Sequence, residues 1–119
     1  MAAALTEIVI DAADPSLLAG FWADVLGWER TDEDETGVEI SPPAGGGPTL
    51  VFVPVPEAKA GKNRVHVDVN PVGCDQDTEL ARLHALGATD ADVGQGDQTW
   101  YVLADPEGNE FCLLRTRVG

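Results

Sequence analysis

The residues best suited to chemistry are carboxylates, a histidine and a cysteine within three short apolar segments. The segment 7–11 reads EIVID, the segment 65–69 reads VHVDV, and the segment 110–114 reads EFCLL. Carboxylate, imidazole and thiolate groups bind divalent metals, and a carboxylate also transfers protons or attracts a cationic ligand. The chemistry that applies depends on how the surrounding elements place these side chains.

Each of the three segments has the alternation of a half-buried β-strand, in which successive side chains point to opposite faces. In the first segment Ile8 and Ile10 are expected to lie beneath a helix. The valines of the second segment and Phe111 of the third are expected to lie opposite the polar residues beside them. The residues predicted to share the face away from the helices, and to form a substrate-binding site there, are Glu7, Val9, Asp11, His66, Asp68, Glu110 and Cys112.

Two helices are predicted, one after each of the first two segments. Asp14 is a good N-cap and Pro15 is tolerated at the first helical position, while Gly27 supplies a left-handed residue at the end. The apolar face of this helix comprises Leu17, Leu18, Phe21, Trp22, Val25 and Leu26. A second helix follows the polar run 75–79, continues through Leu80, Leu83 and Leu86, and ends at Gly87.

The order of elements therefore occurs twice, as strand, helix and three strands. The predicted strands are 7–11, 28–31, 38–41 and 49–55 in the first half, and 65–69, 89–93, 99–104 and 110–115 in the second. These elements predict an α+β domain of two βαβββ modules, each with a helix on one sheet face. A single domain 1–119 is expected, with module 1 at about 5–55, a linker at about 56–63 and module 2 at about 64–116.

The composition of the chain limits the classes of macromolecule that it is expected to bind. The chain of 119 residues carries 21 acidic and 7 basic side chains, for a formal net charge of −14, which repels nucleic acid and anionic lipid. No apolar run approaches the length of about 20 residues that a membrane span needs.

The N-terminal residues lack the features of a secretion signal, so a cytoplasmic location is expected. Cys74 and Cys112 fit no metal-binding spacing and are expected to be reduced thiols.

These segments, taken together, resemble the vicinal oxygen chelate superfamily of glyoxalases, bleomycin-resistance proteins and extradiol dioxygenases, and in particular its small glyoxalase-like domains. The resemblance rests on IVIDAADP at 8–15, FW through LGW at 21–28, KNRVHVD at 62–68, LGA at 86–88 and ADPEGNEFC at 104–112. It implies an open, U-shaped mixed sheet around a cleft, and a homodimer.

The resemblance also implies positions at which a divalent metal ion would be bound. Enzymes of the superfamily hold one divalent ion on side chains of the first, fourth, fifth and eighth strands. Carried over to this chain, the first position is Glu7 and the third is His66, whereas the second falls on Phe52 or Val53, which cannot bind a metal. The fourth falls on Cys112, and Glu110 on the same face is a substitute. No cofactor is certain, and a metal site, if one forms, is predicted on Glu7, His66 and Glu110.

Two functions remain open. The first is the binding of a largely apolar small molecule, with cationic compounds as candidates, in acidic clefts at a dimer interface, without the full metal site of the superfamily. The alternative is a metal-dependent lyase, isomerase or dioxygenase acting on a substrate with vicinal oxygens. Two of the candidate residues also have purely structural interpretations. His66 would hydrogen-bond a neighbouring carboxylate, and Glu110 would accept hydrogen bonds from backbone amides.

Overall fold

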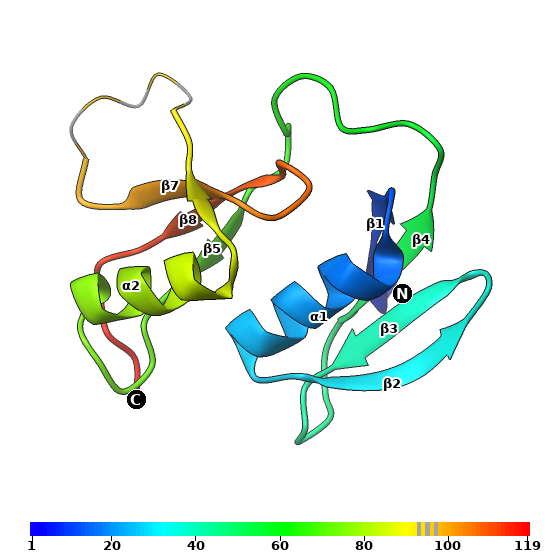
Figure 1. Ribbon diagram of the computed structural model, residues 1–119. Helices are drawn as coiled ribbons and strands as arrows, with labels where there is room; N and C mark the ends of the chain where they lie inside the picture. Colours follow the sequence, from blue (N-terminus) through cyan, green and yellow to red (C-terminus); the bar gives the residue numbers. More distant parts are fainter. Residues whose placement is uncertain (93, 95, 97) are drawn as a thin grey trace. The chain divides into compact units, whose positions relative to one another are not determined.

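The computed structural model describes residues 1–92, 94, 96 and 98–119. Within these residues, two helices and eight strands follow the order strand, helix and three strands, which occurs twice (Figure 1). The elements are β1 (Glu7–Ala12), α1 (Pro15–Leu26), β2 (Glu29–Asp34), β3 (Gly37–Ser41), β4 (Thr49–Pro54), β5 (Val67–Val69), α2 (Gln76–Leu86), β6 (Thr89–Asp90), β7 (Tyr101–Ala104) and β8 (Glu110–Leu113). The predicted α+β fold of two βαβββ units is confirmed.

The two four-stranded sheets have the same topology. The strand order is β1-β4-β3-β2 in the first sheet and β5-β8-β7-β6 in the second. In each sheet the first and last strands of the unit pair in parallel, and the remaining neighbours are antiparallel. The sequence repeat is therefore a structural repeat, in which the first strand of each unit pairs with the last strand of the same unit.

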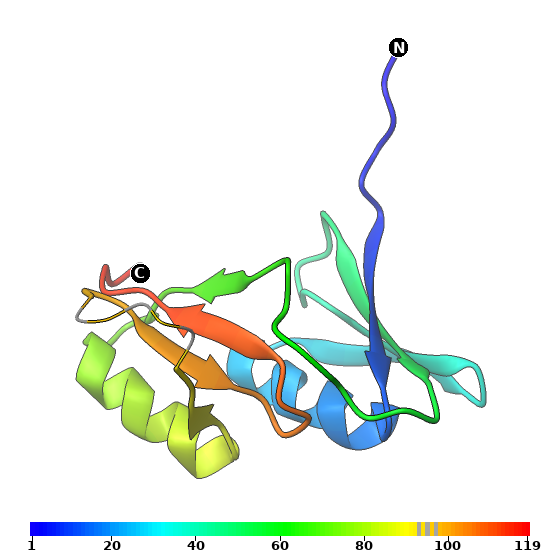
Figure 2. The same cartoon turned by 90° about the horizontal axis from the view of Figure 1, so that it is seen from above.

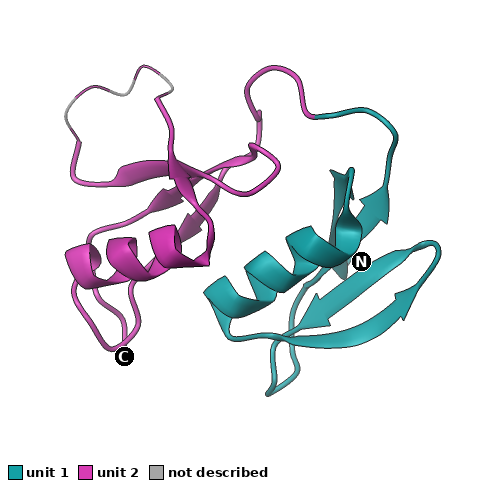
Figure 3. Ribbon diagram, viewed as in Figure 1, with its two compact units in different colours: residues 1–58 teal, residues 59–119 magenta. Residues whose placement is uncertain are grey.

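The chain divides into two compact units, unit 1 at residues 1–58 and unit 2 at residues 59–119 (Figure 3). Unit 1 contains α1 and the sheet β1–β4, preceded by the exposed residues 1–6, which extend past the end of β1 (Figure 2). Unit 2 contains the predicted linker residues from Lys59 onward, α2 and the sheet β5–β8.

Helix α1 forms as the sequence predicts. The Asp14 carboxylate accepts a hydrogen bond from the Leu17 N–H at 3.2 Å, and Gly27 ends the helix with a left-handed φ of 67°. The predicted apolar face is confirmed at Leu18, Phe21, Trp22 and Val25, whereas Leu26 is half-buried and Leu17 is 54% exposed. The core of unit 1 comprises Leu18, Ala19, Phe21, Trp22, Val25, Val38, Ile40, Leu50 and Phe52, together with Ala12 of β1.

Helix α2 is held mainly by side chains at its N-terminal end. The Asp75 carboxylate caps the Thr78 N–H at 2.8 Å, and the Gln76 amide donates to the carbonyls of Thr99 and Leu113. Leu83 is fully buried, as expected. Glu79, in the predicted polar run, is instead only 7% exposed, and its carboxylate is neutralised by both Nε and a terminal nitrogen of Arg82 at 2.7 and 2.8 Å.

Several strand boundaries differ from the predictions. The second strand extends to Asp34 through a bulge, because pairing with β3 overrides the low strand propensity of its acidic residues. The fifth begins at Val67, two residues late, because residues 64–65 form a bend and Val65 is 78% exposed. The strands predicted at 28–31, 89–93, 99–104 and 110–115 become β2, β6, β7 and β8, and Val93 lies outside the described residues.

Within the described part of the chain, neither helix is long and apolar enough to cross a membrane.

Candidate functional site

The sheet of unit 1 has a covered face and an open face. Ala12, Ile40 and Phe52 lie beneath α1 and are nearly inaccessible to solvent. The residues between them in each strand point the other way, so the register places Glu7, Val9 and Asp11 of β1 beside Thr49, Val51 and Val53 of β4. Unit 1 thus brings three of the predicted site residues together on its open face, and Val9 is 53% exposed there.

Two further strands add carboxylates to the same open face. Glu39 of β3 pairs with Val51 on one side and with Asp32 of β2 on the other, and Asp34 pairs with Gly37. A concavity of about 200 Å³ lies over this part of the sheet, and its lining residues are Glu7, Asp32, Asp34, Thr36, Gly37, Glu39 and Val51. We define the acidic face as Glu7, Asp11, Asp32, Asp34 and Glu39 together with Val9 and Val51.

Hydrogen bonds hold two carboxylates of the acidic face. The Thr31 hydroxyl donates to Glu39 at 2.6 Å, and the hydroxyl and N–H of Thr36 donate to Asp34. The pKa of Asp34 is lowered, chiefly by the Thr36 hydroxyl and then by the Thr36 N–H. Asp34 is therefore held as an anion.

The negative charge of the acidic face has no basic side chain on the same face to offset it. Residues 1–58 contain eleven acidic side chains and a single basic one, Arg30. Arg30 pairs in register with the buried Ile40 and donates to the hydroxyl and carbonyl oxygens of Ser16 in α1, so it lies on the covered side of the sheet. A cation at the open face would meet several carboxylates without a competing arginine.

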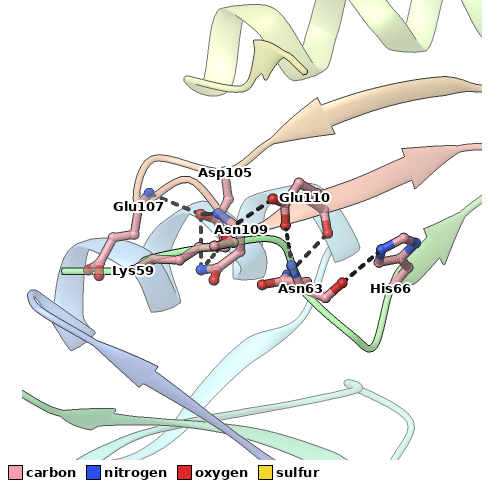
Figure 4. A network of polar contacts seen from close by, with 8 residues as sticks. Lys59, Asn63, His66, Asp105, Glu107, Asn109 and Glu110 are labelled. Atoms are coloured by element: carbon pink, nitrogen blue, oxygen red, sulfur yellow. Dashed lines mark hydrogen bonds and ion pairs between the residues drawn. The ribbon is translucent and has the colours of Figure 1, made fainter. Parts of the chain in front are cut away.

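In unit 2, Glu110 lies at the start of β8 and is fully engaged by residues of the predicted linker (Figure 4). Its Oε1 accepts from the Lys59 ammonium at 3.0 Å, and its Oε2 accepts from the Asn63 N–H at 2.9 Å. The side chains of Lys59 and Glu110 are only 18% and 13% exposed. The structural role predicted for Glu110, holding a backbone amide, is confirmed.

Burial alone would raise the pKa of Glu110, but the hydrogen bonds from Asn63 and Lys59 outweigh it and the net shift is downward. Glu110 is therefore a charged, paired carboxylate, not a proton donor near neutral pH.

His66 is exposed and lies immediately before β5. Its Nε2 is 3.2 Å from the carbonyl oxygen of Asn63, so the ring donates to that backbone group and not to the carboxylates predicted as its structural partners. Asn63 thus contacts both His66 and Glu110, whereas no direct His66–Glu110 contact occurs among the described residues (Figure 4).

The turn before β8 positions Glu110. Asp105 is 3% exposed, and its carboxylate accepts from the N–H groups of Glu107 and Asn109, each at 2.9 Å, and from the Asn109 side-chain amide. Gly108 closes the turn with a left-handed φ of 86°. The side chain of Asn109 therefore serves the turn, and the turn fixes where β8 begins.

Cys112 and Asp68 lie opposite each other in the parallel pair of β8 and β5. Cys112 is 8% exposed, and burial, then the charge of Asp68 and a hydrogen bond to it, raise the pKa of the thiol, opposed only by the charge of Lys62. A thiol with a raised pKa is a poor nucleophile and a poor metal ligand at neutral pH.

This environment predicts an order of thiol reactivity. Iodoacetamide is expected to alkylate the half-buried Cys74 before Cys112 near neutral pH, and Asp68→Asn is expected to speed the reaction at Cys112 by removing the adjacent negative charge. Peptide mass spectrometry of a time course measures both rates. Faster labelling of Cys112 than of Cys74 in the unaltered protein would contradict the assignment of a protonated, buried thiol.

The metal donors that the resemblance implies in unit 2 do not fit a metal as they are arranged. The Glu110 carboxylate already contacts an ammonium ion, and its second oxygen is taken by a backbone N–H. The Cys112 thiol is held protonated, and His66 is bonded to a carbonyl. No group of three or more metal-binding side chains occurs among the described residues of either unit.

A second concavity, of about 280 Å³, lies at the N-terminal end of α2. It is lined by Asp75, Gln76, Asp77, Arg115 and Arg117. Two carboxylates balance the two arginines, and Asp77 also accepts a hydrogen bond from the Tyr101 hydroxyl at 2.9 Å. This balanced lining favours neither anions nor cations.

Comparison with known families gives a match over most of the chain. The sequence profile of the glyoxalase-like domain family matches residues 7–114. The chain belongs to this family. The predicted membership of the glyoxalase, bleomycin-resistance and dioxygenase superfamily is thereby confirmed. No curated protein shows a significant match.

Solved structures of glyoxalase-like proteins share the fold. A glyoxalase/bleomycin resistance protein/dioxygenase family enzyme from Burkholderia phytofirmans PsJN has a TM-score of 0.68 and 20% identity, over 93% of this chain and 97% of that one. The fosfomycin resistance protein FosX from Listeria monocytogenes has a TM-score of 0.72 and 15% identity, over 98% and 93%. A mutant of FosX, solved with Mn(II) and dihydroxypropylphosphonic acid, has a TM-score of 0.70 and 15% identity, over 96% and 90%.

The glyoxalase-like domain thus distributes the predicted site residues over two groups. Glu7, Val9 and Asp11 lie in unit 1, and the other four lie in unit 2.

Sequence analysis missed two sets of neighbours. Glu39 was detectable, because VEIS at 38–41 alternates like a strand, but Asp32 and Asp34 lay beyond the predicted strand end. The contacts of Lys59 and Asn63 with Glu110 were not predicted, because nothing near either residue in the sequence indicates that carboxylate.

Proposed function

We propose that the protein binds a small cationic molecule with an apolar portion at the acidic face, without using a metal. The observation that carries the proposal is the concavity over the open sheet face of unit 1, where the carboxylates of Glu7, Asp32, Asp34 and Glu39 surround Val51. Carboxylates attract and orient a cation, and exposed valines offer apolar surface to the remainder of the molecule.

The charge distribution supports a cationic ligand. None of the described residues that line the concavity is basic, and Arg30 is engaged on the opposite side of the sheet. The strongly acidic chain as a whole would raise the local concentration of cations and repel anionic competitors. A homodimer in the cytoplasm remains part of the proposal, on the resemblance to the superfamily.

The alternative is a metal-dependent lyase, isomerase or dioxygenase that uses Glu7 and His66 with Glu110 or Cys112. The Mn(II) complex of the FosX mutant favours a metal in this fold. In this chain the ion pair of Glu110 with Lys59 and the protonated state of Cys112 weigh against it. Binding without metal is therefore the function that the residues support best.

The proposal is tested with octylamine as the cationic probe and octanol as its uncharged counterpart, by calorimetric titration in the presence of a chelator. Octylamine is expected to bind more tightly than octanol. Glu7→Gln and Asp11→Asn are each expected to weaken octylamine binding about two- to five-fold, since an exposed ion pair contributes up to about 1 kcal/mol.

Glu57→Gln provides the matched control, because it removes the same charge from an exposed position of unit 1 that belongs neither to the acidic face nor to the lining of the concavity. Octylamine binding should be unchanged in this variant. Equal binding of octylamine and octanol, or unaltered octylamine binding in both test variants, would remove the electrostatic basis of the proposal. Binding that requires added metal would favour the alternative.

A further inference from the structure

The eighth strand is where the family resemblance and the structure of this chain disagree. The resemblance places the metal ligand of β8 at Cys112, and Glu110, two residues earlier on the same face, is the carboxylate predicted as its substitute. A metal ligand needs oxygen lone pairs free of competing positive charge. Instead, Oε1 of Glu110 faces the Lys59 ammonium at 3.0 Å, and Oε2 accepts the Asn63 N–H at 2.9 Å.

The contact between Lys59 and Glu110 is built into unit 2 and is not a loose surface pair. Both side chains are mostly buried. The ammonium also donates to the carbonyl of Gly61, and the stem of Lys59 passes near Gly108 of the turn that precedes β8. Several fixed partners thus hold the ammonium in place, so its positive charge is pre-positioned at the carboxylate.

A second lysine of the same segment acts on the other candidate donor of β8. The positive charge of Lys62 acts on the Cys112 thiol, in opposition to burial and to Asp68. Segment 59–63 therefore supplies cationic charge to both Glu110 and Cys112. A divalent ion at this strand would have to displace Lys59 and would be repelled by both ammonium groups.

We infer that the Lys59 ammonium takes the place of a metal ion at β8, so that Glu110 is occupied by the protein's own cation. The charge that a metal would supply at this carboxylate is permanent and comes from segment 59–63. The inference concerns unit 2 alone, so it does not depend on ligand binding at the acidic face of unit 1.

The test uses Mn(II) alone as the probe and measures free Mn(II) by electron paramagnetic resonance during titration of the full chain. Lys59→Met is expected to bind Mn(II) about tenfold more tightly than the unaltered protein, since it removes a positive charge that lies 3.0 Å from the carboxylate and repels the metal ion. The double variant Lys59→Met/Glu110→Gln is expected to lose that gain. Lys62→Met is the matched control, because it removes the same charge without freeing Glu110, and is expected to show a smaller gain.

Lys59→Gln serves the same purpose if the methionine variant does not fold, because the amide keeps a hydrogen-bond donor without the charge. Unchanged Mn(II) affinity in the folded Lys59 variant would overturn the inference, as would an equal gain in Lys62→Met. Tight, stoichiometric Mn(II) binding by the unaltered protein that is lost in Glu110→Gln would also overturn it. Each of these results leaves octylamine binding at the acidic face as a separate question.

Discussion

Replacing Asp105 with alanine is expected to lower the free energy of unfolding by about 3 kcal/mol, because it removes a buried acceptor of several hydrogen bonds from part-buried donors. The Asp105 carboxylate, 3% exposed, accepts from the N–H groups of Glu107 and Asn109 and from the Asn109 side-chain amide. Urea unfolding followed by circular dichroism measures the loss.

Asp105→Asn is the matched variant for this turn. Its amide oxygen can still accept from the backbone N–H groups, so we expect a loss of about 1 kcal/mol, well below that of the alanine variant. Similar losses in the two variants would show that the charge matters more than the acceptor geometry. A loss below about 1 kcal/mol in Asp105→Ala would contradict the structural role assigned to this carboxylate.

The second large effect is expected from Lys59→Met, which should cost about 2–3 kcal/mol near neutral pH, because it leaves the mostly buried Glu110 carboxylate without its counter-ion. In Lys59→Met/Glu110→Gln the uncompensated charge is gone, so much of the loss should be recovered. Urea unfolding of the four proteins in this double-mutant cycle gives the interaction free energy of the pair.

The same pair predicts a pH dependence. The folded-state pKa of Glu110 is lowered: burial raises it, but the Asn63 and Lys59 hydrogen bonds prevail. Its stabilising contribution is therefore fully present above the ordinary glutamate pKa of about 4.3 and is lost as the pH falls through the lower folded-state value. The stability difference between the unaltered protein and Lys59→Met should shrink between neutral pH and about pH 3. A difference that stays constant over this range would show that Lys59 acts through packing alone.

The fold was accessible from the sequence because its signals are local. Asp14, Pro15 and Gly27 mark the ends of α1 through backbone preferences that act within a few residues. Alternation in segment 7–11 identified the strand and the residues of its open face, since the period of a strand is fixed. The expected burial of Ile8 was wrong, because this side chain is 40% exposed. The repeated order of elements then gave the class of the whole chain.

The site was less accessible because its contacts are non-local. Glu110 and Lys59 are 51 positions apart, and nothing in the sequence near either residue indicates the other. The second strand was predicted only at 28–31, and the acidic residues 32–34 join it because β3 pairs with them despite their low strand propensity. Glu79 is buried because Arg82, one helical turn later, neutralises it, a pairing that the spacing allowed but did not require.

The parallel pairing within each unit determines when its first strand can find a partner during synthesis of the chain. β1 pairs with β4 from Glu7 to Pro54, and β5 pairs with β8 from Val67 to Leu113. On the ribosome, β1 therefore emerges long before β4, with which it pairs. The apolar residues of β1 remain unpaired while α1, β2 and β3 are synthesised. The hairpin of β2 and β3 can form first, since it closes only a short loop. Early aggregation during synthesis would consequently be concentrated at the segment Ile8–Ile10, before the last strand of unit 1 arrives.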